Sequence, residues 1–117
     1  MSHRNLYLRF VSLANALQKG ASAEMDPIAF RLLEAITAAH ETGSLLRVSD
    51  ALELADLASH ATLHKKIDML KAQGFVEIEY LNDDRRTKYL APSQLALTYF
   101  DDLGKALMKA SKSKLNG

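Results

Sequence analysis

Hydrophobic residues recur at helical spacing over most of the chain. The spacing predicts a first helix near residues 4–19, which Gly20 stops. A second helix opens at Asp26 and Pro27, an N-cap acceptor followed by a proline with helical φ, and Gly43 ends it. The apolar stripes of these two helices are Leu6, Phe10, Leu13 and Leu17, then Ile28, Leu32, Ala35 and Ala39.

Two shorter helices are predicted in the middle of the chain. Ser49 or Asp50 caps one that continues to Ala55, and residues 56–58 form a turn. Ser59 then caps a helix over 59–73, which Gly74 ends. The core stripe of that helix is Leu63, Ile67 and Leu70.

In the remaining segments the hydrophobic residues either alternate with polar ones, as in strands, or recur at helical spacing. Residues 45–48 predict a short strand, and Val76, Ile78 and Tyr80 alternate with glutamates. A polar tip at 82–87 separates this strand from a return strand at 88–91. A last helix starts at residues 92–93 with the stripe Ala96, Phe100, Leu103, Leu107 and Ala110. The predicted fold is mainly α with a small β-wing.

Length and composition restrict the classes of protein. The 117 residues, 48% of them hydrophobic and 25% charged, fit one folded domain over 1–117. The absence of cysteine excludes disulfides, thiolate zinc sites and thiol catalysis. No segment has the run of about 18 apolar residues that a membrane span needs, and Arg9 and Asn15 interrupt any signal peptide. We therefore expect a cytoplasmic protein with no membrane partner.

Two short helices joined by a brief turn and followed by a hairpin form a winged helix-turn-helix. The major groove admits one helix, whose N-terminal residues reach base edges, while a flanking element contacts phosphate or the minor groove. With the core stripe of helix 59–73 turned inward, the outward residues are Ala61, Thr62, His64, Lys65 and Asp68, with His60 and Lys66 at the margins. The same residues also suit an ordinary solvated helix face.

The hairpin supplies the second half of the predicted DNA surface. Arg85, Arg86 and Lys88 place three cations at or beside its tip, and narrow minor grooves attract arginine. A charged tip that keeps a sheet edge soluble is the alternative. Helix and wing together favour DNA binding, and Ser59 joins the residues expected at the edge of the groove.

The net charge of +1 limits this prediction. Residues 1–58 carry 5 basic and 7 acidic side chains, whereas residues 59–117 carry 10 and 7. The half that holds the predicted recognition helix is therefore the basic one. We expect moderate, salt-sensitive DNA affinity that depends on dimerisation.

From about Leu45 to Ser93 the chain resembles the MarR family of winged-helix transcriptional regulators. The resemblance lies in the run from Ser59 to Leu70 and in the wing run 84–90, which is similar to the family's Asp-x-Arg signature. It implies that Asp84 braces the wing 81–88, that Arg86 enters the minor groove, and that Thr62 lies near the DNA backbone. Residues 92–93 and Ala96 depart from the family pattern, and the chain is shorter than most members.

The resemblance also implies a homodimer on double-stranded DNA, held by helices at 1–20 and 93–112. The first helix has a second apolar stripe of Tyr7, Val11 and Ala14, which agrees with this, as does the seam-like spacing of the last helix. Both helices could, however, merely cap their own core. A small-molecule effector is a further implied partner, with Tyr7, Phe10, Phe30 and Tyr99 as candidates to line its crevice.

Other functions have less support in the sequence. No phosphate loop or catalytic triad pattern is present, so we expect no enzyme, no cofactor and no metal. His60, His64 and Asp68 have metal-like spacing along one helix, but they fall within the predicted DNA surface. A winged-helix module that binds protein instead of DNA remains the main alternative, with Met69, Glu77 and Glu79 as its features.

Overall fold

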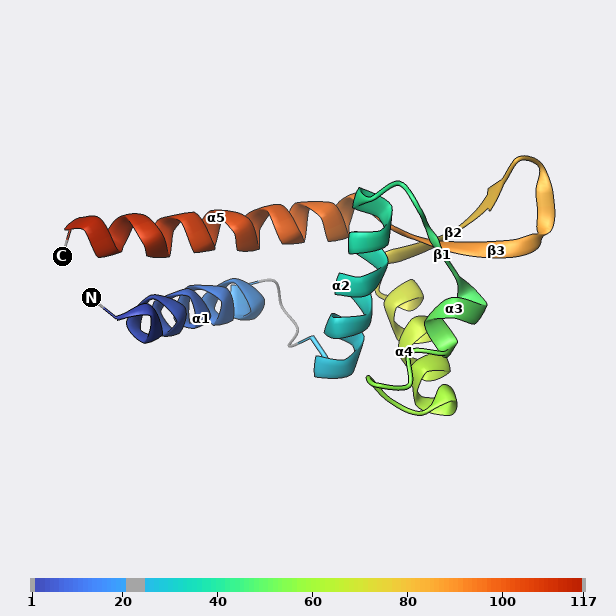
Figure 1. Cartoon of the computed structure of the whole chain (residues 1–117), viewed down its shortest axis with the longest axis horizontal. Helices are drawn as coiled ribbons and strands as arrows, with labels where there is room; N and C mark the ends of the chain where they lie inside the picture. Colours follow the sequence, from blue (N-terminus) through green and yellow to red (C-terminus); the bar gives the residue numbers. More distant parts are fainter. Residues whose placement is uncertain (1, 21–24, 117) are drawn as a thin grey trace. The chain divides into compact units, whose positions relative to one another are not determined.

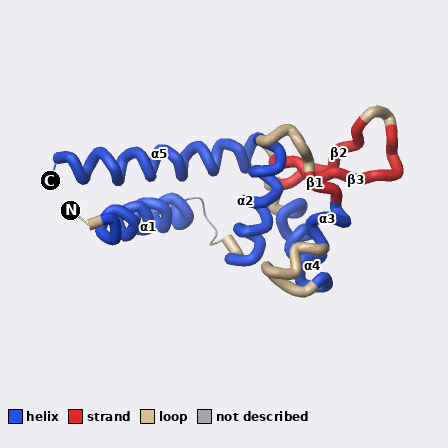
Figure 2. Tube along the Cα trace, viewed as in Figure 1, coloured by secondary structure: helices blue, strands red, loops and turns tan. Residues whose placement is uncertain are grey.

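A computed structural model describes the fold of residues 2–20 and 25–116. Its elements are α1 (His3–Gly20), α2 (Pro27–Glu41), β1 (Leu46–Arg47), α3 (Val48–Leu52), α4 (His60–Ala72), β2 (Val76–Leu81), β3 (Asp84–Pro92) and α5 (Gln94–Asn116). Helices dominate, and the strands are confined to one small sheet (Figure 2). This order confirms the predicted fold class of a mainly helical protein with a β-wing.

The chain divides into two compact units. One comprises Asp26–Leu97 and holds the complete winged helix, from α2 to the start of α5. The other consists of the two terminal stretches, Met1–Met25 and Thr98–Gly117. The winged part of the predicted domain is thus confined to the first unit, and a single domain over 1–117 stays a prediction.

Helix α2 begins where the sequence predicts but buries a different face. The Asp26 carboxylate accepts a hydrogen bond from the Ala29 amide at 3.0 Å, which caps the helix. Gly43 follows the helix with a φ of +82°, a conformation that glycine adopts without strain. The buried residues are Ala29, Leu32, Leu33 and Ile36, whereas Ile28, Ala35 and Ala39 of the predicted stripe are half-buried. The buried face is wider than one stripe because α2 packs against both α4 and β3.

The core of the winged unit lies between α2, α4 and the sheet. Its largest fully buried side chains are Leu32, Leu33, Ile36, Leu63, Leu70 and Leu90. Each such side chain contributes about 1.5–3 kcal/mol of apolar transfer free energy. The predicted stripe Leu63, Ile67 and Leu70 is confirmed as the buried face of α4. Its burial leaves the opposite face of α4 to the solvent.

The sheet has three antiparallel strands in the order β1–β3–β2. Leu90 at its centre pairs with Leu46 of β1 and with Ile78 of β2. The hairpin of β2 and β3 extends beyond the helices of its unit as the wing (Figure 1). The register between these strands shifts between Glu79 and Leu81, so the wing is irregular above its base.

The tip of the wing differs from the prediction. Leu81 pairs with Asp84, so the loop is the two residues Asn82 and Asp83 instead of six. Their φ values of +54° and +63° are those of a type I′ turn, which suits the twist of a hairpin. Strand β3 therefore begins at Asp84, and the predicted start at Lys88 was wrong. The segment 84–88 is polar throughout, so it lacks the alternation by which strands are recognised.

The terminal unit leaves much apolar surface exposed. In α5, Leu103, Ala106 and Ala110 are buried, but Leu107 of the predicted stripe is 51% exposed. Its neighbour Met108 is 58% exposed. In α1, Phe10 and Leu13 are half-buried, whereas Tyr7 and Leu8 are 64% and 57% exposed. The side chain of Leu17 lies outside the described residues.

Candidate nucleic-acid interface

The helix-turn-helix begins with an ion pair that shapes the start of α3. Helix α3 opens at Val48 with Arg47 as its N-cap residue, so the predicted cap at Ser49 or Asp50 was wrong by two or three residues. Instead, Asp50 accepts a hydrogen bond from the Arg47 amide at 3.1 Å and two from its guanidinium, at 3.1 and 3.0 Å. Hydrogen bonds from Arg47 hold the pKa of the Asp50 carboxyl below its ordinary value, and Asp50 raises the pKa of Arg47. This pair fixes the turn from β1 into α3.

The predicted recognition helix is α4, and its first turn is closed by side chains. Ser59 caps it: the Ser59 hydroxyl accepts from the Thr62 amide at 3.3 Å and donates to the Thr62 hydroxyl at 3.0 Å. Both residues belong to the predicted DNA-binding set. They lie together at the N-terminus of α4, the part of a recognition helix that approaches base edges in this kind of fold.

The outward face of α4 carries most of the other predicted residues. His60, Ala61, His64, Lys65 and Asp68 are exposed, and Thr62 is half-exposed. The His64 imidazole lies 3.4 Å from Asp68, whose other oxygen is 3.6 Å from Lys71. Among the described residues, His60 and Lys65 have no side-chain partner. Their donors are therefore open to an external acceptor.

Lys66 lies apart from this set. Its ammonium is 3.0 Å from the Asp26 carboxylate at the start of α2, and its side chain is only 19% exposed. Sequence reasoning placed Lys66 at the edge of the DNA surface, but the structure gives its charge an internal partner. Asp26 was recognisable in the sequence as a helix cap, whereas a pairing across 40 residues leaves no local signal.

The wing holds its two arginines in different ways. The Arg86 amide donates to Asp84 at 2.9 Å and its Nε donates at 3.3 Å, yet the side chain is 93% exposed. The Arg85 guanidinium lies over the Tyr80 ring, 5.4 Å from its centre. Lys88 is exposed farther along the strand. All three cations lie on β3, and the contact of Arg85 with Tyr80 was not foreseen from the sequence.

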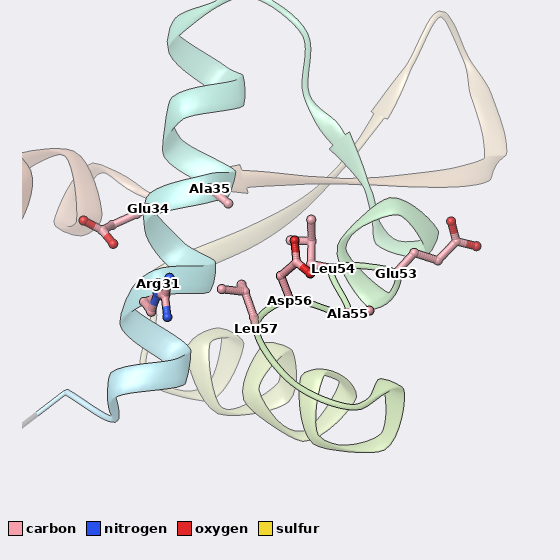
Figure 3. Close-up of a pocket in the computed structure, with 8 residues that line it drawn as sticks. All are labelled: Arg31, Glu34, Ala35, Glu53, Leu54, Ala55, Asp56 and Leu57. Carbon is pink, nitrogen blue, oxygen red and sulfur yellow. The ribbon is translucent and has the colours of Figure 1, made fainter.

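A hollow of about 510 Å³ opens between α2 and the segment after α3. Its lining is Arg31, Glu34, Ala35 and residues 53–57. Figure 3 shows the carboxylates of Glu34 and Glu53 on opposite outer sides, while Leu54 and Leu57 lie between. Three acids against one arginine make this side unsuited to phosphate. The candidate interface is therefore the exposed side of α4 together with the wing.

Two further predictions concern metal and effector sites. Within residues 2–20 and 25–116, no three histidine, aspartate or glutamate side chains are grouped as a metal site requires, so the pattern of His60, His64 and Asp68 forms no such group. Of the aromatic residues expected around an effector, Tyr7 is exposed, and Phe10 and Tyr99 belong with it to the terminal unit. Phe30 belongs to the winged unit.

No helix in the described ranges is both long enough and apolar enough to cross a bilayer. The sequence matches no protein-family model. It also matches no curated protein sequence.

The fold, in contrast, is similar to that of solved structures, among them a MarR-like transcriptional regulator. A MarR-like transcriptional regulator from Thermotoga maritima superposes with a TM-score of 0.65 at 15% identity, covering 99% of this chain and 82% of that one. A mutant of MepR from S. aureus gives 0.68 at 12% identity, with the same coverage. The heme sensor protein PefR from Streptococcus agalactiae, in complex with heme, gives 0.61 at 19%, covering 97% and 76%. The chain therefore has the MarR-like winged-helix fold, as the sequence resemblance predicted.

Proposed function

We propose that this protein is a MarR-like transcriptional regulator that binds double-stranded DNA in a sequence-specific manner. The observation that carries the proposal is the combination of a MarR-like fold with open cationic and polar donors on the exposed face of α4 and on the wing. Under this proposal α4 enters the major groove and the wing contacts the minor groove or the backbone. The function is that of a binding protein, not an enzyme.

The proposed contacts on α4 follow from exposure and from hydrogen-bonding capacity. Thr62, His64 and Lys65 approach the major groove, with Ser59 and His60 at its edge. Lys65 is the strongest candidate because its ammonium is exposed and has no partner among the described residues. The Ser59 and Thr62 hydroxyls already bond each other, so a phosphate or base edge would add to that pair as an acceptor.

The proposed wing contacts divide into two kinds. Arg86 reaches the minor groove, because Asp84 holds its backbone and Nε while the rest of the guanidinium stays in solvent. Arg85 and Lys88 contact phosphates. The carboxylate of Asp84 orients Arg86, but its negative charge also lowers the local positive potential that would attract DNA.

We also propose that the protein acts as a homodimer through its terminal helices, 1–20 and 93–112. The exposed apolar residues Tyr7, Leu8, Leu107 and Met108 support this proposal, since large exposed apolar side chains gather at association sites. A two-fold dimer presents two recognition helices to half-sites about 34–36 Å apart. The operator is then roughly palindromic.

The rival function, a winged helix that binds protein, has little support on α4. Met69 is half-buried, and none of the large exposed apolar residues in the described ranges belongs to this helix. Such a module would replace the polar DNA face by an apolar one. The α4 surface instead keeps its histidines, hydroxyl and lysine.

Selection from a pool of random duplexes, followed by fluorescence anisotropy, tests the proposed function. We expect an enriched, roughly palindromic sequence and weaker binding to unrelated duplexes at low salt. Lys65→Ala should weaken binding and lower the salt slope by about 1 if Lys65 contacts phosphate. Arg31→Ala in α2 is the matched control, since it removes one exposed cation from the side of the acidic hollow, outside both the proposed DNA surface and the proposed dimer helices. No binding of wild type to any duplex at low salt would refute the proposal.

A further inference from the structure

One carboxylate connects the start of α2 to the middle of α4. In the Asp26 side chain, Oδ2 accepts from the Ala29 amide at 3.0 Å, and Oδ1 accepts from the Lys66 ammonium at 3.0 Å. The side chains of Asp26 and Lys66 are 29% and 19% exposed, so the pair is largely screened from solvent. These two bonds hold the pKa of the Asp26 carboxyl below its ordinary value, with the Ala29 amide as the largest cause. The Asp26 carboxylate thus forms hydrogen bonds with both α2 and α4.

The core contacts of α4 are apolar. Leu63, Ile67 and Leu70 attach the helix through apolar contacts, which have little directional preference. A charge-assisted hydrogen bond is directional and is stronger than a neutral one. Since Lys66 adjoins Lys65 in the sequence, the bond acts one residue away from the proposed DNA face.

Small rotations of α4 matter for base contacts. Side chains on a helix end about 5–6 Å from its axis. A rotation of about 10° therefore moves their tips by about 1 Å, enough to spoil hydrogen-bond distances that tolerate only a few tenths of an ångström. A bond that limits rotation consequently affects recognition of bases more than attraction to phosphates.

We propose that Asp26 and Lys66 are a positioning pair that fixes the rotation of α4 on α2 and thereby the sequence specificity of the protein. This inference rests on the proposed DNA-binding function. It assigns Lys66 no contact with DNA, unlike its neighbour Lys65. The competing explanation is that Lys66 leaves Asp26 and binds a phosphate when DNA arrives.

Two conservative substitutions separate these explanations. Asp26→Asn removes the charge but keeps an N-cap residue of similar strength. Lys66→Met keeps the apolar stem and removes the ammonium. Each variant and the double variant is measured on the selected operator and on a random duplex, with the folded fraction checked by circular dichroism at the assay temperature.

A positioning pair gives both single variants the same result. We expect each to lose about 5- to 10-fold in operator affinity, a part of what one good base contact contributes. Binding to random duplex and the salt slope should stay unchanged, and the double variant should be no worse than either single one. Lys66→Arg should restore operator affinity. Lys71→Met, which removes a lysine of α4 that is paired with Asp68 on the same helix, is the control and should leave specificity intact.

The opposite results would overturn the inference. If Lys66 binds phosphate, Lys66→Met lowers affinity for both duplexes and reduces the salt slope by about 1, while Asp26→Asn raises affinity. If the pair only stabilises the fold, both variants melt earlier but bind the operator as wild type does. If wild type binds no duplex, the proposed function itself fails, and that outcome is distinct from both of these.

Discussion

Replacing Asp83 at the wing tip by glycine should stabilise the hairpin, and replacing it by alanine should destabilise it. Asn82 and Asp83 form the two-residue loop between Leu81 and Asp84, with φ values of +54° and +63°. A type I′ turn requires positive φ at both positions, and Asn-Gly is the preferred pair. Asp83 therefore occupies a position at which glycine is the better residue.

The expected sizes follow from the cost of the left-handed region. An ordinary L-residue pays about 1–2 kcal/mol there, and aspartate recovers part of it through local hydrogen bonds. Glycine avoids the steric cost but loses about 0.5–1 kcal/mol more in backbone entropy on folding. We expect Asp83→Gly to gain about 0.3 kcal/mol and Asp83→Ala to lose about 0.5 kcal/mol relative to wild type.

Urea unfolding measures the global effect, and amide hydrogen exchange at Leu81 and Asp84 measures the local one. Both substitutions remove the same carboxylate, so the difference of about 0.8 kcal/mol between them reports backbone conformation and not charge. Asp83→Asn, which tolerates positive φ, is the neutral control and should lie near wild type. Equal stability of the glycine and alanine variants, with equal exchange rates at the tip, would refute the type I′ turn.

The other predictions concern the ion pair, the wing aromatic and the terminal helices. Asp26→Asn should lower the free energy of unfolding by about 0.5–1 kcal/mol at pH 7. Because the folded-state pKa of Asp26 is lowered, the extra stability of wild type is present above about pH 4 and disappears as the pH falls through the folded-state pKa. Melting temperatures of the two proteins that stay equally far apart at low pH would contradict this prediction. Tyr80→Leu removes the ring beneath Arg85 and should lower the affinity for any duplex by about 2- to 5-fold, whereas Tyr80→Phe keeps the ring and should leave the affinity unchanged. Equal anisotropy titrations for the two variants would exclude a role for the ring. Leu107→Glu should convert a dimer to a monomer in sedimentation velocity, because it places a charge on the exposed apolar surface of α5. A wild type already monomeric at tens of micromolar would contradict the dimer.

Helix α4 could be predicted because its signals are local. Ser59 supplies a cap, Gly74 a stop with a φ of +80°, and the stripe of Leu63, Ile67 and Leu70 a single buried face. Each of these signals acts within one or two helical turns. The sequence therefore places α4 within one residue of its observed ends.

The sequence-based predictions of buried residues and strand ends fail where long-range packing or backbone conformation determines them. Helix α2 contacts both α4 and β3, so Leu33 and Ile36 join Leu32 in the core beyond the predicted stripe. The strand at 84–88 is solvated and shows no period of two, so only the positive φ of two loop residues reveals the hairpin tip. In the first case the outcome depends on elements distant in the chain, and in the second it depends on the conformation of the backbone.

The same distinction applies to the candidate site. Exposure of Lys65 and His64 follows from helical periodicity, and the contact of Asp84 with Arg86 spans two residues. The pairing of Lys66 with Asp26 has no such basis, because it depends on how two helices pack. A lysine that the sequence groups with the DNA-binding residues can therefore have an internal role, and periodicity alone cannot separate the two.

The pairing of charges explains why the proposed binding depends on two protomers. Residues 59–93 carry 6 basic and 5 acidic side chains, a net charge of only +1. Asp68 lies beside His64 and Lys71, and Asp84 beside Arg86, so phosphate must compete with carboxylates already in place. Among the described residues, Lys65, Arg85 and Lys88 have no carboxylate partner. Because each phosphate contact contributes to affinity through counterion release, one protomer has few to offer, and a dimer doubles them on one DNA face. Under the proposed function, the exposed apolar residues of the terminal helices therefore matter for DNA affinity as directly as the cations do.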